Sequence, residues 1–367
     1  MREVMPHSGI LGLRSKKRLK RRELQLSRSD RRATELKKKG VLGERRIIEI
    51  VRGQLDLPCM SVPFGDDVSA WELENGLVAV LKTDMLVDKT DIPPGMSLQQ
   101  AARKAVVMNV SDFAAKGVKP SALLVSLGLP RNLTQKNIID LAKGLNAGAR
   151  EHNCYVLGGD TGETSDLIIN ISLFGVAKEH EIVLRNGATP GDFVAVTGFF
   201  GKTSAGLKIL LNNLQVPASV RKVLVESVLM PQARLKEGLA LARTGAVSAS
   251  IDSSDGLAWS LHELARAGKV GFLIEKLPLA KEAERFAEHC KLDAVKLALY
   301  GGEEYELVLT IKPGLLERAR QAAVEAGGML LSIGRVTARR GLFLFTDGER
   351  RVIEPRGYEH FRSDFVR

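Results

Sequence analysis

Aspartates occur at several places in this 367-residue chain where the neighbouring residues are apolar or glycine. The stretch I-D-S-S-D-G-L at 251–257 places Asp252 and Asp255 three residues apart, directly after the small and apolar run T-G-A-V-S-A-S-I. Such a run should enter a hydrophobic core, where a carboxylate without a partner is costly. The pair therefore needs a chemical explanation.

The same anomaly recurs at four other places along the chain. They are Asp66-Asp67 after Gly65, Thr83-Asp84 in an apolar strand, Asn109 with Asp112 in an apolar helix, and Asp160-Thr161 after two glycines. Taken singly, each could be an ordinary turn or capping aspartate. If they converge, two carboxylates about 4 Å apart repel by roughly 4 kcal/mol at an intermediate effective dielectric. Such a cluster needs bound cations to stay ionised and together.

The donor set indicates which cations these would be. Oxygen ligands without His or Cys favour Mg²⁺ or Mn²⁺ over zinc, and the sequence does not separate these two ions. Mg²⁺ commonly shares its coordination shell with substrate phosphates. Glycines beside Asp67, Asp160 and Asp255 would let the backbone approach those phosphates closely. The residues alone thus predict metal-assisted phosphoryl transfer.

The elements that must position these acids mix helices and strands without a regular alternation, which predicts an α+β fold rather than one parallel sheet. A helix at 98–116, with Ser97 as N-cap and Gly117 as its stop, is apolar on nearly every face and should be buried. Turn formers at 185–192 indicate a domain boundary. We expect a basic, disordered extension at 1–40, a metal- and ATP-binding α+β domain at 41–184, and a second α+β domain at 185–367. Further expected elements are helices near 134–151, 203–213, 234–243 and 314–326, and a turn at L-G-G-D-T-G-E-T (157–164).

One segment imitates a phosphate-binding motif. V-T-G-F-F-G-K-T-S-A-G contains Gly201-Lys202-Thr203 between a strand and a helix, but the Walker A spacing requires glycine where Val196 stands. The helix N-terminus could still hold a phosphate with Lys202 nearby.

Charge and composition limit the other readings. Residues 1–40 hold 14 Lys/Arg and 4 Asp/Glu, so almost all of the net charge of +11 lies there. Such a segment could hold nucleic acid, although no aromatic residue is interleaved with the charge, which favours a solvated extension. No apolar run reaches the ~18 residues of a membrane helix. Without a signal core, and with three separated cysteines, the chain is expected to be cytoplasmic.

In order along the chain, seven stretches resemble thiamine-monophosphate kinases, a family within the aminoimidazole-ribotide-synthetase superfamily. They are F-G-D-D-V-S, K-T-D-M-L-V-D-K-T-D, N-V-S-D-F-A-A-K-G-V-K-P, L-G-G-D-T-G-E-T, I-D-S-S-D-G-L, G-G-E-E-Y-E-L and G-Y-E-H-F, and they span about 43–361. Residues 1–40 have no counterpart in the family, which is expected of a dispensable extension or an upstream start.

The resemblance implies ATP-dependent phosphorylation of thiamine monophosphate to thiamine diphosphate by a homodimer whose N-terminal domains pair into a barrel-like sheet. It implies a magnesium shell of several ions, nucleotide contacts, and contacts to the thiamine side. The magnesium shell would comprise Asp67, Thr83, Asp84, Asp112, Asp160, Asp252 and Asp255. The nucleotide contacts would be Gly159, Asp160, Arg185 and Ser254, with Lys202 as an added candidate. The contacts to the thiamine side would be Glu303 and Tyr358.

Two local departures from the family pattern leave roles open. Lys89-Thr90-Asp91 replaces a glycine-histidine-phenylalanine ending and places Asp91 at a substrate-facing position. G-F-F-G-K-T-S-A-G replaces the commoner loop around Lys202. The alternatives are another ATP-dependent enzyme of the superfamily, such as an aminoimidazole-ribotide synthetase, or a nucleic-acid-binding protein that uses the basic arm.

Overall fold

The computed structural model describes residues 42–346 and 348–361, so the basic extension predicted at 1–40 lies outside the described residues. These residues fall into two units. The smaller holds helix α2 (Glu44–Arg52) with the chain up to Leu57 and the residues from Glu359, and the larger runs from Pro58 to Tyr358. All predicted site residues belong to the larger unit. None of the described helices is long and apolar enough to cross a membrane.

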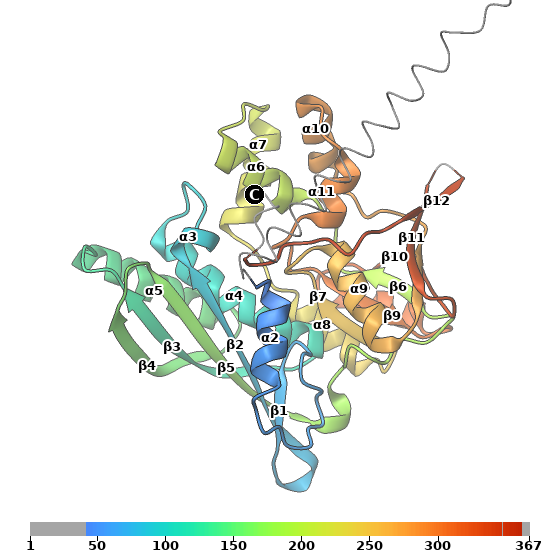
Figure 1. Cartoon of the computed structure of the whole chain (residues 1–367), viewed down its shortest axis with the longest axis horizontal. Helices are drawn as coiled ribbons and strands as arrows, with labels where there is room; N and C mark the ends of the chain where they lie inside the picture. The colour runs from blue at the N-terminus through green and yellow to red at the C-terminus, as the bar shows by residue number, and fades with distance from the viewer. Residues whose placement is uncertain (1–41, 347, 362–367) are drawn as a thin grey trace, which may run out of the picture. The chain divides into compact units, whose positions relative to one another are not determined.

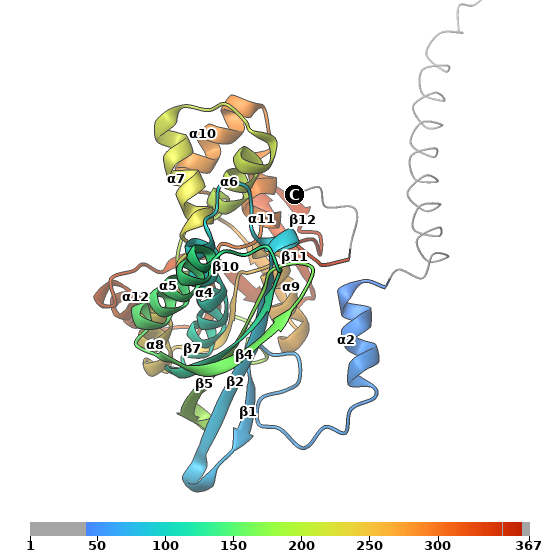
Figure 2. The same cartoon turned by 90° about the vertical axis from the view of Figure 1, so that its left-hand side faces the viewer.

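The first half of the larger unit is built on a five-stranded sheet with the order β1-β2-β5-β3-β4. All neighbours in it are antiparallel except β3 and β4. Helices α4 and α5 lie on one side of this curved sheet (Figure 2). The elements are β1 (Ser69–Glu72), β2 (Leu77–Val87), α3 (Asp88–Asp91), α4 (Leu98–Lys116), β3 (Pro120–Leu129), α5 (Gln135–Glu151), β4 (Tyr155–Glu163) and β5 (Ile168–Lys178), with short 3₁₀ turns at Glu74–Gly76 and Glu179–Glu181.

Local sequence sets both ends of α4. The Ser97 hydroxyl accepts from the backbone N–H of Gln100, whose side chain reaches back to the Ser97 N–H, so the helix begins with a capping box. Gly117 ends it in the left-handed region at φ 68°. Fifteen of its 19 residues are buried, which confirms the predicted buried helix at 98–116.

The second half contains a seven-stranded, mostly antiparallel sheet with the order β12-β11-β8-β10-β6-β9-β7 (Figure 1). Its strands are β6 (Phe193–Val196), β7 (Val247–Asp252), β8 (Gly271–Ile274), β9 (Leu307–Ile311), β10 (Leu331–Thr337), β11 (Gly341–Thr346) and β12 (Glu349–Val352). Its helices are α6 (Lys202–Asn212), α7 (Ala218–Leu229), α8 (Leu235–Arg243), α9 (Leu257–Gly268), α10 (Lys281–Cys290), α11 (Ala294–Tyr300) and α12 (Leu316–Glu325).

One hydrophobic core runs through both halves because α4 lies between the two sheets. Phe113 of α4 belongs to the same buried cluster as Ile171 of β5 and Leu309 of β9. A second cluster, on the other face of the seven-stranded sheet, contains Val308 and Leu261 of α9. The mixed α+β character matches the prediction. The change of sheet falls near the expected boundary at 185, inside one compact unit.

The turn predicted at 157–164 is wrong, because β4 occupies Tyr155–Glu163. Of the two glycines that indicated a turn, Gly159 instead allows close strand pairing. A Cβ on Gly159 would lie 1.7 Å from the Val125 carbonyl oxygen on β3, so only glycine fits there. Asp160 therefore lies within an edge strand, not at a strand end.

Candidate metal and phosphate site

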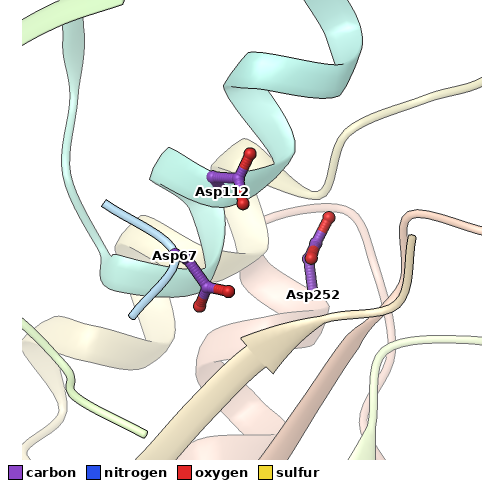
Figure 3. Close-up of side chains that lie close together, drawn as sticks. All are labelled: Asp67, Asp112 and Asp252. Carbon is purple, nitrogen blue, oxygen red and sulfur yellow. The ribbon is translucent and has the colours of Figure 1, made fainter. Parts of the chain in front are cut away.

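Three of the predicted acids converge in the larger unit (Figure 3). Asp67 lies in the loop before β1, Asp112 on the last turns of α4, and Asp252 at the end of β7. One carboxylate oxygen from each lies within 4.8 Å of the other two, and all three residues are buried. In the described part of the chain, no other group of three or more His, Cys, Asp or Glu has this geometry. At that separation and an effective dielectric of about 20, each pair of carboxylates would repel by roughly 3 kcal/mol.

Basic side chains of the protein surround this acid cluster. Lys116 on α4 is fully buried, and its Nζ lies 2.6 Å from Asp66 Oδ1 and 2.7 Å from Asp67 Oδ2. The guanidinium of Arg185 donates to Asp67 and, at 2.9 Å, to the Gly65 carbonyl oxygen. Protein cations therefore neutralise the Asp66–Asp67 turn.

Lys82 connects the cluster to Asp84. Its Nζ lies 3.1 Å from Asp112 Oδ2 and 3.2 Å from Asp84 Oδ2. Asn109, one turn before Asp112, accepts from the backbone N–H of Asp84 at 3.0 Å. The interrupted strand and the buried helix are thus joined by Asp84, Asn109 and Asp112, which the sequence had singled out, together with Lys82, which it had not.

The three clustered carboxyls differ in their proton affinity. Burial would raise the pKa of Asp67, but the charges of Arg185 and Lys116 lower it to about 2. Burial and the neighbouring Asp67 charge raise the pKa of Asp252 to about 6. Burial also raises the pKa of Asp112 well above its ordinary value, against the attraction of Lys82. The cluster thus carries more negative charge than its surroundings balance.

A divalent cation fits this donor set. The three carboxylates offer oxygen alone, which suits Mg²⁺ or Mn²⁺. A cation bound among them would offset the repulsion that raises the pKa of Asp112 and Asp252. The Ser111 hydroxyl donates to Asp252 Oδ2 at 2.7 Å and orients that carboxylate.

Two predicted shell residues lie away from the three clustered acids. Side chains alternate along β2, so Thr83 points to the exposed face of the sheet while Lys82 and Asp84 point toward α4. Asp160 is exposed on β4, and strands β3 and β5 separate β4 from β2.

Main-chain hydrogen bonds bring together four other predicted residues, which are Ser254, Asp255, Glu303 and Tyr358. The N–H of Glu303 donates to the Ser254 carbonyl oxygen at 2.7 Å, and the N–H of Tyr358 donates to that of Asp255 at 3.0 Å. Asp255 is half-buried and Ser254 is exposed. Ser254, Asp255, Glu303 and Tyr358 therefore occupy one loop cluster that follows Asp252.

Each glutamate of G-G-E-E-Y-E-L has a different partner. Glu303 binds the Nζ of Lys104 at 2.6 Å, and Glu306 takes the guanidinium of Arg234 at 2.8 and 2.6 Å. Glu304 accepts from the backbone N–H groups of Gly201 and Thr203 at 2.6 and 3.2 Å. The N-terminus of α6, where a phosphate was considered, is thus capped by a carboxylate of the chain itself. Lys202 begins this helix, and its charge opposes the burial that raises the pKa of Glu304 to about 7.

Asp91, which was expected at a substrate-facing position, is buried. Its carboxylate accepts from the Val87 N–H at 2.8 Å and from the Thr90 hydroxyl at 2.9 Å, so it stabilises the turn at α3. Its carbonyl oxygen accepts from Lys104 at 2.9 Å.

A pocket of about 850 Å³ reaches Asp66 and Asp67 but is not lined by Asp112 or Asp252. Asp67, Lys82 and Thr83 line one part of it, and Leu124, Leu157 and Phe174 line another. The pocket therefore opens on the exposed face of the first sheet.

Sequence reasoning missed the half-buried Lys82 and the fully buried Lys104 and Lys116. The available signal was the one used for Asp112: a charge inside an element that is otherwise apolar. Lysine seldom lies fully buried unless it is paired, so the lysines of α4 carried the same information as its aspartate.

Comparison with known proteins identifies the family of both halves of the larger unit. Residues 65–177 match the model of the AIR synthase related protein N-terminal domain, and residues 189–347 match its C-terminal domain. The chain is 38% identical to a thiamine-monophosphate kinase of Nitrosopumilus maritimus, over 81% of this chain and 93% of that protein. It is 35% identical to one of Pyrococcus abyssi, over 81% and 90%. A solved structure described as AaThiL complexed with AMPPCP and TMP superposes with a TM-score of 0.75 at 29% identity, covering 87% of this chain and 97% of that one. The seven motifs, the two matched domains and these relatives agree: the chain belongs to the thiamine-monophosphate kinase family.

Proposed function

We propose that this protein transfers the γ-phosphoryl group of ATP to the phosphate of thiamine monophosphate, giving thiamine diphosphate and ADP. The observation that carries the proposal is the convergence of Asp67, Asp112 and Asp252 within 4.8 Å. The relative with bound AMPPCP and TMP supports the substrate pair.

Asp67, Asp112 and Asp252 would hold Mg²⁺, with Asp84, Asp160 and Asp255 as further candidate ligands. When bound, Mg²⁺ neutralises phosphate charge that develops during transfer. The acceptor phosphate has a second pKa of about 6 and is already largely ionised at pH 7. No side-chain base is therefore required, and catalysis is mainly positioning and charge neutralisation.

The chain's own residues would bind and orient the two substrates. Gly159, Ser254, Arg185 and Lys202 are the candidate nucleotide contacts; Arg185 is held beside the acids by Asp67 and Gly65. Glu303 and Tyr358 would contact the thiamine side, with Glu303 fixed by Lys104. Asp91 would act there indirectly, through its carbonyl oxygen on Lys104.

The exposed face of the first sheet supports pairing with a second copy. Leu81, Met85, Leu124 and Phe174 present large apolar side chains there, and Leu157 on edge strand β4 is 71% exposed. An apolar sheet face of this kind normally contacts a partner. Thr83 lies on the same face and Asp160 on the edge strand, so dimer pairing would bring both to the subunit interface. Sedimentation of the native chain and of Phe174→Glu would test this, with a native monomer contradicting it.

The function itself is tested by incubating the purified chain with ATP, Mg²⁺ and thiamine monophosphate and resolving thiamine diphosphate by chromatography. Asp252→Asn should lower turnover by orders of magnitude while the protein stays folded. Asp140→Asn, which removes a surface ion pair with Lys136, is the matched control. A near-normal rate for Asp252→Asn would sink the assignment. ATP binding without thiamine diphosphate formation would instead favour the related reaction of aminoimidazole-ribotide synthesis.

A further inference from the structure

Lys82 occupies the space between two candidate metal ligands. It lies on the inward face of β2, with its side chain 18% exposed, and its Nζ is 3.1 Å from Asp112 and 3.2 Å from Asp84. An ammonium has three donors on one nitrogen and can bridge two carboxylates as a compact point charge.

The charges around Lys82 leave an excess of negative charge that one divalent cation would neutralise. Asp66, Asp67, Asp84, Asp112 and Asp252 face the three cationic side chains of Lys82, Lys116 and Arg185. With every group ionised the formal balance is −2, the charge of one divalent cation. Glu263, 4.0 Å from Arg185, has Arg266 as its own counter-ion.

Lys82 already binds one carboxylate oxygen of Asp84 and one of Asp112, so a metal ion cannot bind between these two oxygens while the ammonium is there. Mg²⁺ would need carboxylate oxygens at about 2.0–2.1 Å. That would place a double positive charge where the ammonium already lies at hydrogen-bond distance from both acids. The acid cluster formed by Asp67, Asp112 and Asp252 differs in that Lys82 binds Asp112 alone among them, while Lys116 and Arg185 bind Asp67 alone among them. One carboxylate oxygen from each of the three lies within 4.8 Å of the other two.

We propose that Lys82 is a built-in cation that takes the place of one divalent ion between Asp84 and Asp112, so that metal binding by the free enzyme is confined to the Asp67–Asp112–Asp252 cluster. The inference rests on the metal-assisted function proposed above. It assigns Lys82 as a positioning residue, which holds two carboxylates at a fixed separation before any metal or nucleotide arrives.

The test counts metal ions directly. Mn²⁺ binding to the full chain, without nucleotide, is measured by electron paramagnetic resonance of the free ion. Lys82→Met removes the charge at similar length and should bind one more Mn²⁺ per chain than the native protein. Lys82→Arg keeps the charge and should bind the native number. Lys136→Met, which removes an exposed lysine of α5, is the matched control and should also bind the native number.

A second pair of variants decides the matter even if Lys82→Met does not fold. Asp84→Asn should leave the Mn²⁺ count of the native chain unchanged, because Lys82 already occupies that carboxylate. Asp252→Asn should lower the count by one. An unchanged count in a folded Lys82→Met, or a lowered count in Asp84→Asn, would overturn the proposal. These counts do not depend on whether thiamine monophosphate is the substrate, so failure of the proposed function remains distinguishable.

Discussion

The ammonium of Lys104 lies 2.6 Å from the carboxylate of Glu303 and joins α4, which packs on the first sheet, to the loop that leads into β9 of the second. The lysine side chain is 1% exposed and that of the glutamate 25%. Removing one partner of such a buried pair leaves the other charge uncompensated.

Lys104→Met should therefore destabilise the chain by about 3–5 kcal/mol, whereas Glu303→Gln, which leaves a hydrogen-bond acceptor, should cost less. The double variant should recover part of the loss, because it removes both charges. Urea unfolding of the four proteins gives the coupling free energy. Additive effects would show that the two residues do not interact in solution.

Glu304 should make stability fall as pH rises through neutrality. Burial raises its pKa from 4.5 to about 7, so the folded chain holds this proton more tightly than the unfolded chain does. The contribution to stability is complete below about pH 4.5 and is lost as pH passes about 7, a change of about 1–3 kcal/mol. Glu304→Gln keeps the acceptor for Gly201 and Thr203 and should lack this dependence.

Urea unfolding between pH 5 and pH 8 checks the prediction. As pH rises, the free energy of unfolding of the native chain should fall relative to that of Glu304→Gln. Glu317→Gln, at an exposed glutamate paired with Arg320, should follow the native profile. Parallel profiles for Glu304→Gln and the native chain would contradict the raised pKa.

Asp252→Asn should separate stability from metal binding. With a chelator present at pH 8, the variant should be more stable than the native chain by about 1–3 kcal/mol, because ionised Asp252, with its pKa raised to about 6, opposes folding there. Excess Mg²⁺ should stabilise the native chain by about 2–3 kcal/mol at a hundred times the dissociation constant, and the variant less. Thermal unfolding with and without Mg²⁺ measures both. Equal Mg²⁺ stabilisation of the two proteins would show that Asp252 is not a ligand.

Gly238→Ala should be destabilising although alanine is the better helix former. Gly238 lies in α8, and a Cβ there would lie 2.1 Å from the Ala114 carbonyl oxygen on α4. The two helices would have to separate, at a cost of about 1–3 kcal/mol, which exceeds the gain of up to about 1 kcal/mol in helix propensity. Gly162→Ala, with nothing within 4 Å of the added Cβ, is the control and should change stability by less than about 0.5 kcal/mol. A Gly238→Ala chain as stable as the native one would refute this close helix contact.

Local signals were sufficient to predict α4 and its anomaly. Ser97 and Gly117 set its ends through bonds to residues within one turn, and Asp112 stood out because its neighbours are apolar on every face. These features depend on a short window of sequence. The mixture of helix and strand patterns predicted the α+β fold, and the turn formers at 185–192 predicted the boundary.

The partners of these residues depend on long-range packing and could not be predicted in the same way. Gly158 and Gly159 indicated a turn from local sequence alone. The reason for a glycine at 159 is its close pairing with Val125, which lies more than 30 positions away in the sequence. The lysines were overlooked because most lysines are solvated, and only the packed structure shows that Lys116 is fully buried between Asp66 and Asp67. Thr83 was predicted to lie in the magnesium shell with its neighbour Asp84, but the side chains of neighbouring strand residues point to opposite faces of the sheet.

The order of the cluster's residues along the chain has a consequence for its synthesis on the ribosome. Asp67 and Asp112 emerge from the exit tunnel together with Lys82 and Lys116, so the nascent first half already carries counter-ions for its own acids. Asp252 follows 140 residues after Asp112. A growing chain can thus fold its first sheet around neutralised carboxylates, while the three-carboxylate site is completed only when translation has passed β7.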